Sequence, residues 1–267
     1  MVGIITSHSG LRPEAKRYVM AGRGVVVDKG GRGDFTTITD AVNYMAARGS
    51  HTALAPNGPT ANSGRIWIRN GHYKESVDVD NLPGLDQIIL EGESWNTLID
   101  GTDTASSAVI LDAQRSRVMN LVMYTPGAAG LDGTACQINN PATFATVHNC
   151  WIVDSDNNGI ATSAGWTRFS DNEIQGADAA GIRLSANFNI SVGNHIASAG
   201  TDGVLITGSG SSTTIVANVV YGCAGDGIEI DANGNNCCVV GNNLISNTGE
   251  GVDDNSGTST VTGNETS

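Results

Sequence analysis

The stretch GIEIDANGNNCCVVGNNLIS, residues 227–246, mixes the residue types of strands with those of turns. Ile228 and Ile230 alternate with polar residues, and Val239 and Leu244 return among glycines and asparagines. Alternation with a period of two is typical of a strand with one buried face, whereas Gly and Asn tolerate the left-handed backbone of tight bends. The stretch therefore predicts very short strands joined by turns.

The same mixture recurs at a regular interval along the chain. One marker is a glycine followed by an aliphatic residue, with successive spacings of 22, 22, 24 and 24: Gly159, Gly181, Gly203, Gly227 and Gly251. The other marker is an asparagine, with successive spacings of 23, 22, 24, 24 and 22: Asn149, Asn172, Asn194, Asn218, Asn242 and Asn264. Two markers that keep step from unit to unit indicate an internal repeat of stacked units.

Each repeat is too short for a strand–helix–strand crossover, which takes roughly 30 residues or more, so successive units must wind the same way and pair in parallel. This predicts an all-β fold, a parallel β-solenoid whose neighbouring coils lie about 4.8 Å apart. We expect equivalent asparagines to form a hydrogen-bonded ladder. We also expect the residue after each glycine to face the interior, together with the apolar residue two places after each asparagine: Trp151, Ile174, Ile196, Val220 and Leu244.

The N-terminal end of the solenoid has a predicted lid. Its apolar residues follow a helical stripe: Ile38, Ala41, Val42, Met45 and Ala46. We expect a capping helix over about residues 37–48, which Thr37 caps and Gly49 ends. Residues 25–267 then form the β-helix and residues 1–24 a separate N-terminal arm. The arm carries four basic residues that we expect to dock on a partner: Arg12, Lys16, Arg17 and Arg23.

Charge divides the chain unequally. The net charge is −13, but residues 1–75 hold ten of the 14 Lys and Arg and only five of the 27 Asp and Glu. Two interpretations are open: the acidic body serves solubility, or the basic end docks on an acidic partner while the acidic body projects into solvent. Residues 76–267 hold only four arginines and no lysine, too few for a phosphate-binding surface, so we expect no nucleic-acid partner.

Cysteine and hydropathy patterns exclude further classes. The five cysteines include no C-x-x-C pair, so we expect buried thiols rather than a zinc site or a disulfide framework. We expect no metal and no cofactor. The first residues lack the apolar core of a signal peptide, and no window approaches about 18 apolar residues. We accordingly expect a soluble chain with no membrane partner.

Residues 25–105 resemble the opening of the pectin methylesterases, within the pectin-lyase-like superfamily of right-handed parallel β-helices. The match runs through VVVDKGGRGDFTT at 25–37, IWIRNGHYKE at 66–75 and IILEG at 88–92. The resemblance implies a single-stranded right-handed coil with three sheets. The catalytic motifs of those esterases are missing after Glu75, and so is the polygalacturonase pattern. The fold therefore carries over, and the esterase and hydrolase activities do not.

Acidic residues mark the candidate site. The residue before the marker glycine is acidic in three successive coils: Asp202, Asp226 and Glu250. If the protein is an enzyme, Asp202, Asp226 and the outward-facing Glu229 are the candidates for catalysis, because glycoside cleavage needs two carboxyl groups roughly 5–10 Å apart. A Ca²⁺ site or a solvated row of turn residues fits the same pattern. Early aromatic residues could line a sugar groove: Trp67, Tyr73, Trp95 and Tyr124.

Three functions remain open. The first is a non-catalytic structural protein of a phage virion, a capsid decoration or cement protein or a short spike that docks on the capsid shell through residues 1–24. Similarity to phage β-helix proteins implies a homotrimer on the virion surface. The second is an extracellular carbohydrate-active enzyme, a polysaccharide lyase or glycoside hydrolase. The third is a carbohydrate-binding β-helix module that binds a cell-surface polysaccharide. The missing catalytic motifs favour the first.

Overall fold

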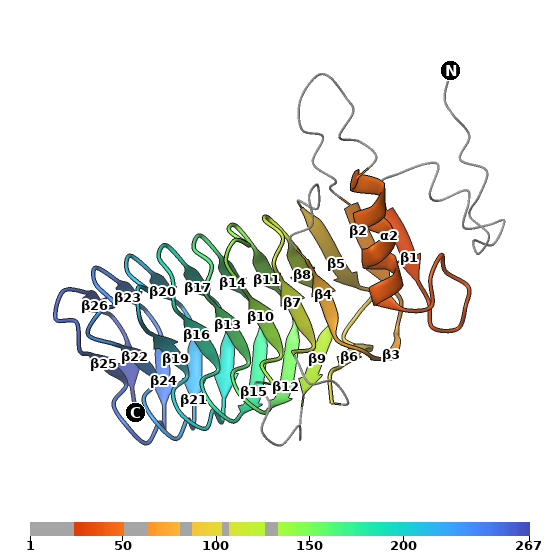
Figure 1. The fold of residues 1–267 in the computed structure, drawn as a ribbon. Coiled ribbons are helices and arrows are strands. Elements are labelled where there is room, and N and C mark those ends of the chain that lie inside the picture. The colour runs from red at the N-terminus through yellow and green to blue at the C-terminus, as the bar shows by residue number, and fades with distance from the viewer. Residues whose placement is uncertain (1–23, 51–63, 81–86, 103–106, 126–132) are drawn as a thin grey trace.

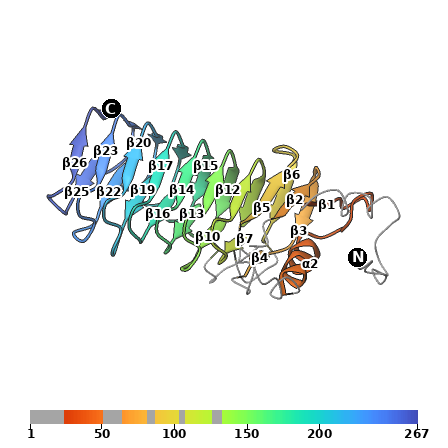
Figure 2. The ribbon, with the colours of Figure 1, turned by 90° about the horizontal axis from the view of Figure 1, so that it is seen from above.

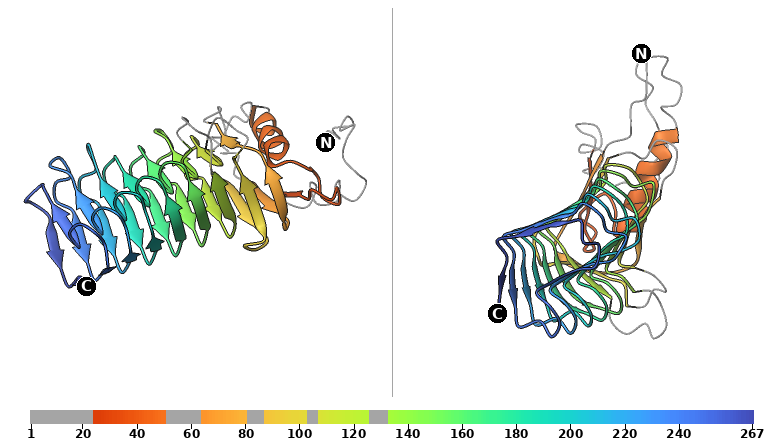
Figure 3. Two further views of the ribbon diagram at one scale, coloured as in Figure 1. Left: turned by 90° about the horizontal axis from the view of Figure 1, so that it is seen from below. Right: turned by 90° about the vertical axis from the view of Figure 1, so that its left-hand side faces the viewer.

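The computed structural model describes residues 24–50, 64–80, 87–102, 107–125 and 133–267. Within them the chain winds into a rod of short strands, and each complete coil contributes one strand to each of three sheets (Figure 1). The view along the rod shows the coils stacked one behind another (Figure 3). The parallel β-solenoid expected from the repeat is confirmed.

The described residues form sheets of ten, nine and eight strands, here called A, B and C. Sheet A consists of β1 (Gly24–Val27), β2 (Gly64–Ile68), β5 (Ile88–Gly92), β8 (Arg117–Met119), β11 (Thr146–His148), β14 (Arg168–Ser170), β17 (Ile190–Val192), β20 (Thr214–Val216), β23 (Cys238–Val240) and β26 (Thr260–Thr262). Sheet B consists of β3 (Gly71–Lys74), β6 (Thr97–Asp100), β9 (Val122–Thr125), β12 (Trp151–Ser155), β15 (Glu173–Ala177), β18 (His195–Ala197), β21 (Val219–Tyr221), β24 (Asn243–Ile245) and β27 (Glu265–Thr266). Sheet C consists of β4 (Val77–Val79), β7 (Val109–Leu111), β10 (Cys136–Ile138), β13 (Ile160–Thr162), β16 (Ile182–Leu184), β19 (Val204–Ile206), β22 (Ile228–Ile230) and β25 (Val252–Asp254).

One helix of the described residues, α2 (Ile38–Ser50), covers the end of the rod where β1 lies (Figure 2). Thr37 caps it as expected, and the backbone N–H groups of its first two residues donate to the carboxylate of Glu75 at 2.9 Å each. A carboxylate at this end satisfies free amides and interacts well with the helix dipole. Glu75 is the last residue of the motif shared with the esterases, and in this chain its role is to hold the first turn of the capping helix. No helix in the described ranges has the length and apolarity to cross a membrane.

The interior is filled by aliphatic side chains that repeat from coil to coil. The residue after the marker glycine is fully buried in four coils, as expected: Ile160, Ile182, Val204 and Ile228. Burying each such side chain contributes roughly 1.5–3 kcal/mol. The five cysteines are free thiols and all but Cys238 are buried. Burial raises the pKa of the Cys136 thiol, as expected for a cysteine that acts as a small apolar residue.

The asparagine ladder runs through the later coils as expected. Each Oδ1 accepts the backbone N–H of the asparagine one coil earlier at 2.9–3.0 Å, and each earlier side-chain amide donates to the same oxygen at 2.8–3.0 Å. The members are Asn172, Asn194, Asn218, Asn242 and Asn264. Because all but the last are almost fully buried, these bonds satisfy polar groups that water does not reach.

The prediction for Asn149 is wrong by one residue. The Oδ1 of Asn172 accepts the backbone N–H of Cys150 at 3.0 Å, so Cys150 holds the ladder position in that coil. Asn149 instead forms the left-handed bend before it, with a φ of 49°. Because a slip of one residue turns every side chain to the other face, Ile152 is fully buried and Trp151 points outward, against the expectation for Trp151.

The marker glycines are required by close approach of neighbouring coils. None of the five has a positive φ, whereas the residue before each ladder asparagine forms a left-handed bend. A Cβ at Gly203 would lie 2.1 Å from Cγ1 of Val220 and 2.6 Å from the backbone oxygen of Gly227. Gly159, Gly181 and Gly227 meet the next coil at similar distances. The positions were predicted, but the reason is space and not backbone conformation.

Candidate functional site

Three acidic residues singled out from the sequence lie together on sheet C. Carboxylate oxygens of Asp202, Asp226 and Glu229 lie within 4.8 Å of one another. Asp202 and Asp226 occupy equivalent turns one coil apart, before β19 and β22, and Glu229 is the outward middle residue of β22. The repeat explains why these carboxylates lie together, because it brings the same residue type to the same corner in successive coils.

Hydrogen bonds and burial decide what this acidic cluster can do. Asp202 accepts the backbone N–H of Asp226 through Oδ1 at 2.8 Å, and Asp226 accepts that of Glu250. Burial raises the pKa of Glu229, and the charge and hydrogen bond of Asp202 raise it further. The two aspartates therefore satisfy turn amides, and Glu229 is the member of the cluster whose pKa is raised. The same oxygens suit a hard cation such as Ca²⁺.

Sequence reasoning missed a second acidic cluster near the other end of sheet C. Carboxylate oxygens of Asp78, Asp80 and Asp112 lie within 4.8 Å of one another. Burial raises the pKa of Asp78 to about 6, with further contributions from the charges of Asp80 and Asp112. The alternation VDVD at 77–80 was a visible signal. Asp112 joins the pair only through the register of β4 with β7, which no local pattern reveals.

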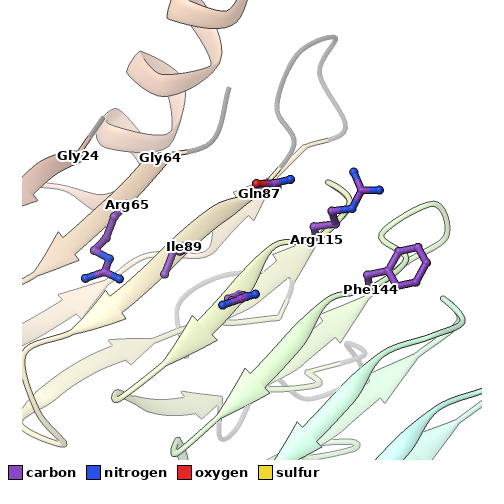
Figure 4. A pocket seen from close by; sticks show the side chains of 8 residues that line it. Gly24, Gly64, Arg65, Gln87, Ile89, Arg115 and Phe144 are labelled. Carbon is purple, nitrogen blue, oxygen red and sulfur yellow. The ribbon is translucent and has the colours of Figure 1, made fainter. Parts of the chain in front are cut away.

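A groove of about 690 Å³ runs over the first strands of sheet A (Figure 4). Its side-chain lining is basic, amide and apolar: Arg65, Gln87, Ile89, Arg115, Arg117 and Phe144. Figure 4 shows Gln87, Arg115 and Phe144 in a row at the beginnings of successive strands. No acidic side chain lines the described groove.

The row continues beyond the groove as a stack of aromatic rings, Phe144, Trp166 and Phe188, here called the aromatic ladder. Ring centroids are 6.0 Å apart between Phe144 and Trp166, and 4.3 Å apart between Trp166 and Phe188, with planes inclined by 27° and 19°. The three residues are 49 %, 53 % and 42 % exposed. A contiguous exposed apolar patch of this kind is typical of a binding surface.

Each ring of the aromatic ladder stands on left-handed backbone two residues before a strand of sheet A. The φ angles are 63°, 60° and 62° in chain order. Ser212 and Asn236 hold the same position in the next two coils, with φ of 55° and 56°, so the bend itself belongs to the fold. Such a conformation costs a bulky residue on the order of 1–3 kcal/mol. The chain therefore places aromatic residues where small polar ones would fold more readily, which indicates a surface function.

Three of the four arginines in residues 76–267 lie on sheet A or on the bend before it, like the aromatic ladder. The guanidinium carbon of Arg115 lies 5.7 Å from the ring centroid of Phe144 and covers one end of the stack. Arg117 and Arg168 occupy one register row on the outer face of β8 and β14. None of the three has a carboxylate partner among the described residues. Unpaired cations gathered on one face make that face attractive to anions.

The remaining residues singled out from the sequence are the basic residues of the arm and the aromatic residues of the early coils. The basic arm residues, Arg12, Lys16, Arg17 and Arg23, lie outside the described residues. Among the early aromatic residues, Tyr73 is buried in the core and Trp95 is 45 % exposed. The aromatic ladder was missed although its three members recur at the same interval as the first three marker glycines. That equality of spacing is the signal that could have found it.

Comparison with known proteins identifies the scaffold. The family model described as "Right handed beta helix region" matches residues 61–266. The comparison with curated proteins gives no match. A solved pectin methylesterase mutant in complex with a hexasaccharide aligns over 86 % of this chain and 80 % of its own, at 16 % identity and a TM-score of 0.58. A pectin methylesterase from carrot aligns over 92 % and 89 %, at 14 % identity and a TM-score of 0.51.

A third similar structure is named as a glucanase and not as an esterase. The catalytic domain of a GH87 α-1,3-glucanase, in complex with nigerose, aligns over 81 % of this chain and 43 % of its own, at 15 % identity and a TM-score of 0.52. At such identities the likeness extends to the fold alone. The expected pectin-lyase-like right-handed parallel β-helix with three sheets is confirmed. An esterase and a glucanase share it, so function must be argued from this chain's own surface.

Proposed function

This chain belongs to the right-handed β-helix family, and we propose that its function on that scaffold is to bind an acidic polysaccharide along sheet A. One observation carries the proposal: unpaired arginines and exposed aromatic rings share one face of an acidic protein. Guanidinium groups bind carboxylates through paired hydrogen bonds. Aromatic side chains offer apolar surface to the C–H groups of sugar rings. An anionic sugar polymer presents both partners.

The proposed binding surface is linear, as a polymer requires. It extends over six strands of sheet A, from β2 to β17, which at about 4.8 Å per step is about 24 Å. A polymer lying along the rod would meet the groove with Arg115 and Arg117 first. It would then reach the aromatic ladder, where Arg168 follows Trp166 by two residues. Arginines and aromatic rings thus follow one another over several coils along the rod axis.

The surface offers binding groups without catalytic ones. From β2 to β17 the outer face of sheet A carries one acidic residue, Glu91, and its carboxylate pairs with Arg65 at 3.1 Å. Hydrolysis of a glycosidic bond needs two carboxyl groups that flank it. The geometry of this face therefore supports binding without cleavage.

Affinity electrophoresis and calorimetry with polygalacturonate and alginate, against neutral dextran, test the proposal. The wild-type protein should bind the acidic polymers, and more weakly as salt rises, because salt screens exposed charges. The double variant Arg117→Gln/Arg168→Gln should lose affinity for the acidic polymers by about tenfold or more. Arg183→Gln is the matched control, because Arg183 is the fourth arginine of the body and lies on the outer face of sheet C. Equal binding by the double variant and the wild type would refute the proposal.

The proposed location of this binding protein is the surface of a phage virion. There it would act as a capsid decoration or cement protein or a short spike, form a homotrimer and dock through residues 1–24. The support is the division of charge, with ten basic against five acidic residues in 1–75 and four against 22 in 76–267. Sedimentation of the 27.5 kDa chain and imaging of particles test this. A particle-bound trimer is expected, and a monomer that binds no particle would contradict it.

A second candidate function is cleavage of a polysaccharide by a lyase or glycoside hydrolase at the acidic cluster. The favouring observation is that Asp202 and Asp226 lie beside Glu229, whose raised pKa suits a general acid. Release of reducing ends or unsaturated products from a polysaccharide panel measures it. Glu229→Gln should abolish the release, and Glu173→Gln on the outer face of sheet B should not. No product from any substrate would reject this function.

A further inference from the structure

We propose a second binding site, for a neutral pyranose sugar, in a pocket that two tryptophans form on the outer face of sheet B. The pocket has a volume of about 470 Å³ and lies over β3, β6, β9 and β12. Its side-chain lining is His72, Trp95, Asn96, Leu98, Val122 and Trp151. These residues lie at or just before the starts of sheet B strands, whereas the aromatic ladder precedes the strands of sheet A. The two surfaces are therefore on different corners of the coil.

Trp95 is fixed by the fold in a position that exposes its ring. It leaves the turn between β5 and β6, and its Nε1 donates to the backbone oxygen of Asn149 at 3.0 Å, 54 residues further along the chain. The side chain thus spans the intervening coil, a distance of roughly 10 Å. The residue is still 45 % exposed. An apolar face that is already oriented binds a ligand without the cost of ordering a side chain.

Trp151 reaches the pocket through the one-residue slip at Asn149. Its ring centroid lies 6.0 Å from that of Trp95 and the planes are inclined by 42°, so the two rings form an angled wall. Its Nε1 is buried without an acceptor among the described residues, which costs about 1–3 kcal/mol. The next coils hold Glu173 and His195 at this register position. The fold therefore does not require a tryptophan here, and binding supplies a reason for it.

The other lining groups are polar and aliphatic side chains that suit the hydroxyls and ring faces of a sugar. The side-chain amide of Asn96 has no hydrogen-bond partner among the described residues. His72 bonds through Nε2 to Asp100 at 2.5 Å, which orients the ring and leaves Nδ1 available. Leu98 and Val122 form an apolar floor. Apolar ring faces with a few polar groups, and no Arg, Lys, Asp or Glu among the described lining residues, favour a neutral sugar over the acidic polymer of sheet A.

The indole N–H signals of the full chain in ¹⁵N NMR spectra provide the test, because each of the four tryptophans gives one. The probes are methyl glycosides and disaccharides of glucose, mannose and N-acetylglucosamine. The signals of Trp95 and Trp151 should shift saturably, and that of Trp166 should not. Trp95→Ala should weaken binding about tenfold or more. Asn96→Ala removes a side chain that makes no hydrogen bond with the described residues, so the variant should fold normally while binding several-fold more weakly.

Matched variants separate this site from the sheet A surface. Trp166→Ala should keep the binding of neutral sugars and lose affinity for acidic polymers. No saturable shift at Trp95 with any of these sugars, or wild-type affinity in both Trp95→Ala and Asn96→Ala, would overturn the second site. Shifts that only an acidic polymer produces, and that Arg117→Gln/Arg168→Gln abolishes, would assign the pocket to the sheet A surface. A proline-rich peptide that shifts these signals where sugars do not would also overturn it.

Discussion

Replacing Asn218 with alanine is expected to lower the free energy of unfolding by about 2–4 kcal/mol. Asn218 is 1 % exposed. Its Oδ1 accepts the backbone N–H of Asn194 at 3.0 Å and the side-chain amide of Asn194 at 2.9 Å, and its own amide donates to Oδ1 of Asn242 at 3.0 Å. Alanine leaves the N–H of Asn194 buried without an acceptor, which costs about 1–3 kcal/mol. The lost bonds and the small cavity account for the remainder.

Urea unfolding followed by far-UV circular dichroism measures this loss, provided that the slope against urea is unchanged. Asn243→Ala is the matched control. Asn243 follows ladder residue Asn242 directly but faces outward from β24, and its side chain makes no hydrogen bond among the described residues. Its change should stay within about 0.5 kcal/mol. If Asn218→Ala unfolds at the same urea concentration as Asn243→Ala, the ladder does not stabilise the rod and the reasoning fails.

The same measurement tests the slip at Asn149. Among the described residues its side-chain amide makes one hydrogen bond, to Oδ1 of Asn120 at 2.9 Å, on a partly exposed corner. Asn149→Ala should therefore cost about 1–2 kcal/mol, from this hydrogen bond and from a left-handed bend that alanine tolerates less well than asparagine. A loss as large as that of Asn218→Ala would place Asn149 in the ladder and contradict the assignment of Cys150 to that position.

Three further predictions concern backbone spacing, pH and thiol reactivity. Gly203→Ala should lower stability by about 1–3 kcal/mol or more, since the added methyl group would overlap the next coil. In the control Gly208→Ala the methyl group points into open space, so the variant should lose only about 1–2 kcal/mol from its left-handed backbone. Equal melting temperatures of the two variants would contradict the close approach at Gly203. The pKa of Asp78 is raised from 3.8 to about 6, so the unfolded chain loses this proton first and the wild type loses stability as pH rises through that window. Asp78→Asn should melt progressively higher than the wild type between those pH values, and a difference independent of pH would reject the raised pKa. A maleimide reagent should modify Cys238 first in the native protein, because the other four thiols are buried; rapid modification of all five would show an open core.

The repeat could be predicted from spacing because each coil places the same residue types at the same corner. Asn149 shows the limit of that reasoning. Asparagine suits both the ladder position and the left-handed bend before it, so a spacing of 23 instead of 22 was the only local sign of the slip. Cys150 fills the ladder position through its backbone N–H, which any residue type except proline provides. Trp151 was consequently assigned to the core, and the pocket it forms with Trp95 could not be foreseen.

The acidic cluster and the arginine surface differ in how they could be found. Asp202 and Asp226 stand beside a repeat marker, so the alignment of markers was enough to bring them together. Arg117 and Arg168 lie two coils apart in the sequence and share a row only because β8, β11 and β14 pair in register. The aromatic ladder needs the same three-dimensional register, although its spacing was visible.

Register also decides how net charge bears on binding. A body with four basic residues against 22 acidic ones predicts no anion site when charge is summed along the chain. Yet the outer face of sheet A carries no acidic residue from β8 to β26: its outward positions are Arg117, Met119, Thr146, His148, Arg168, Ser170, Ile190, Val192, Thr214, Val216, Cys238, Val240, Thr260 and Thr262. Exposed charges more than about 10 Å apart are largely screened at 0.1 M salt. An anion above Arg117 therefore responds mainly to this face, and the acidic residues on the other faces limit the affinity mainly at low salt.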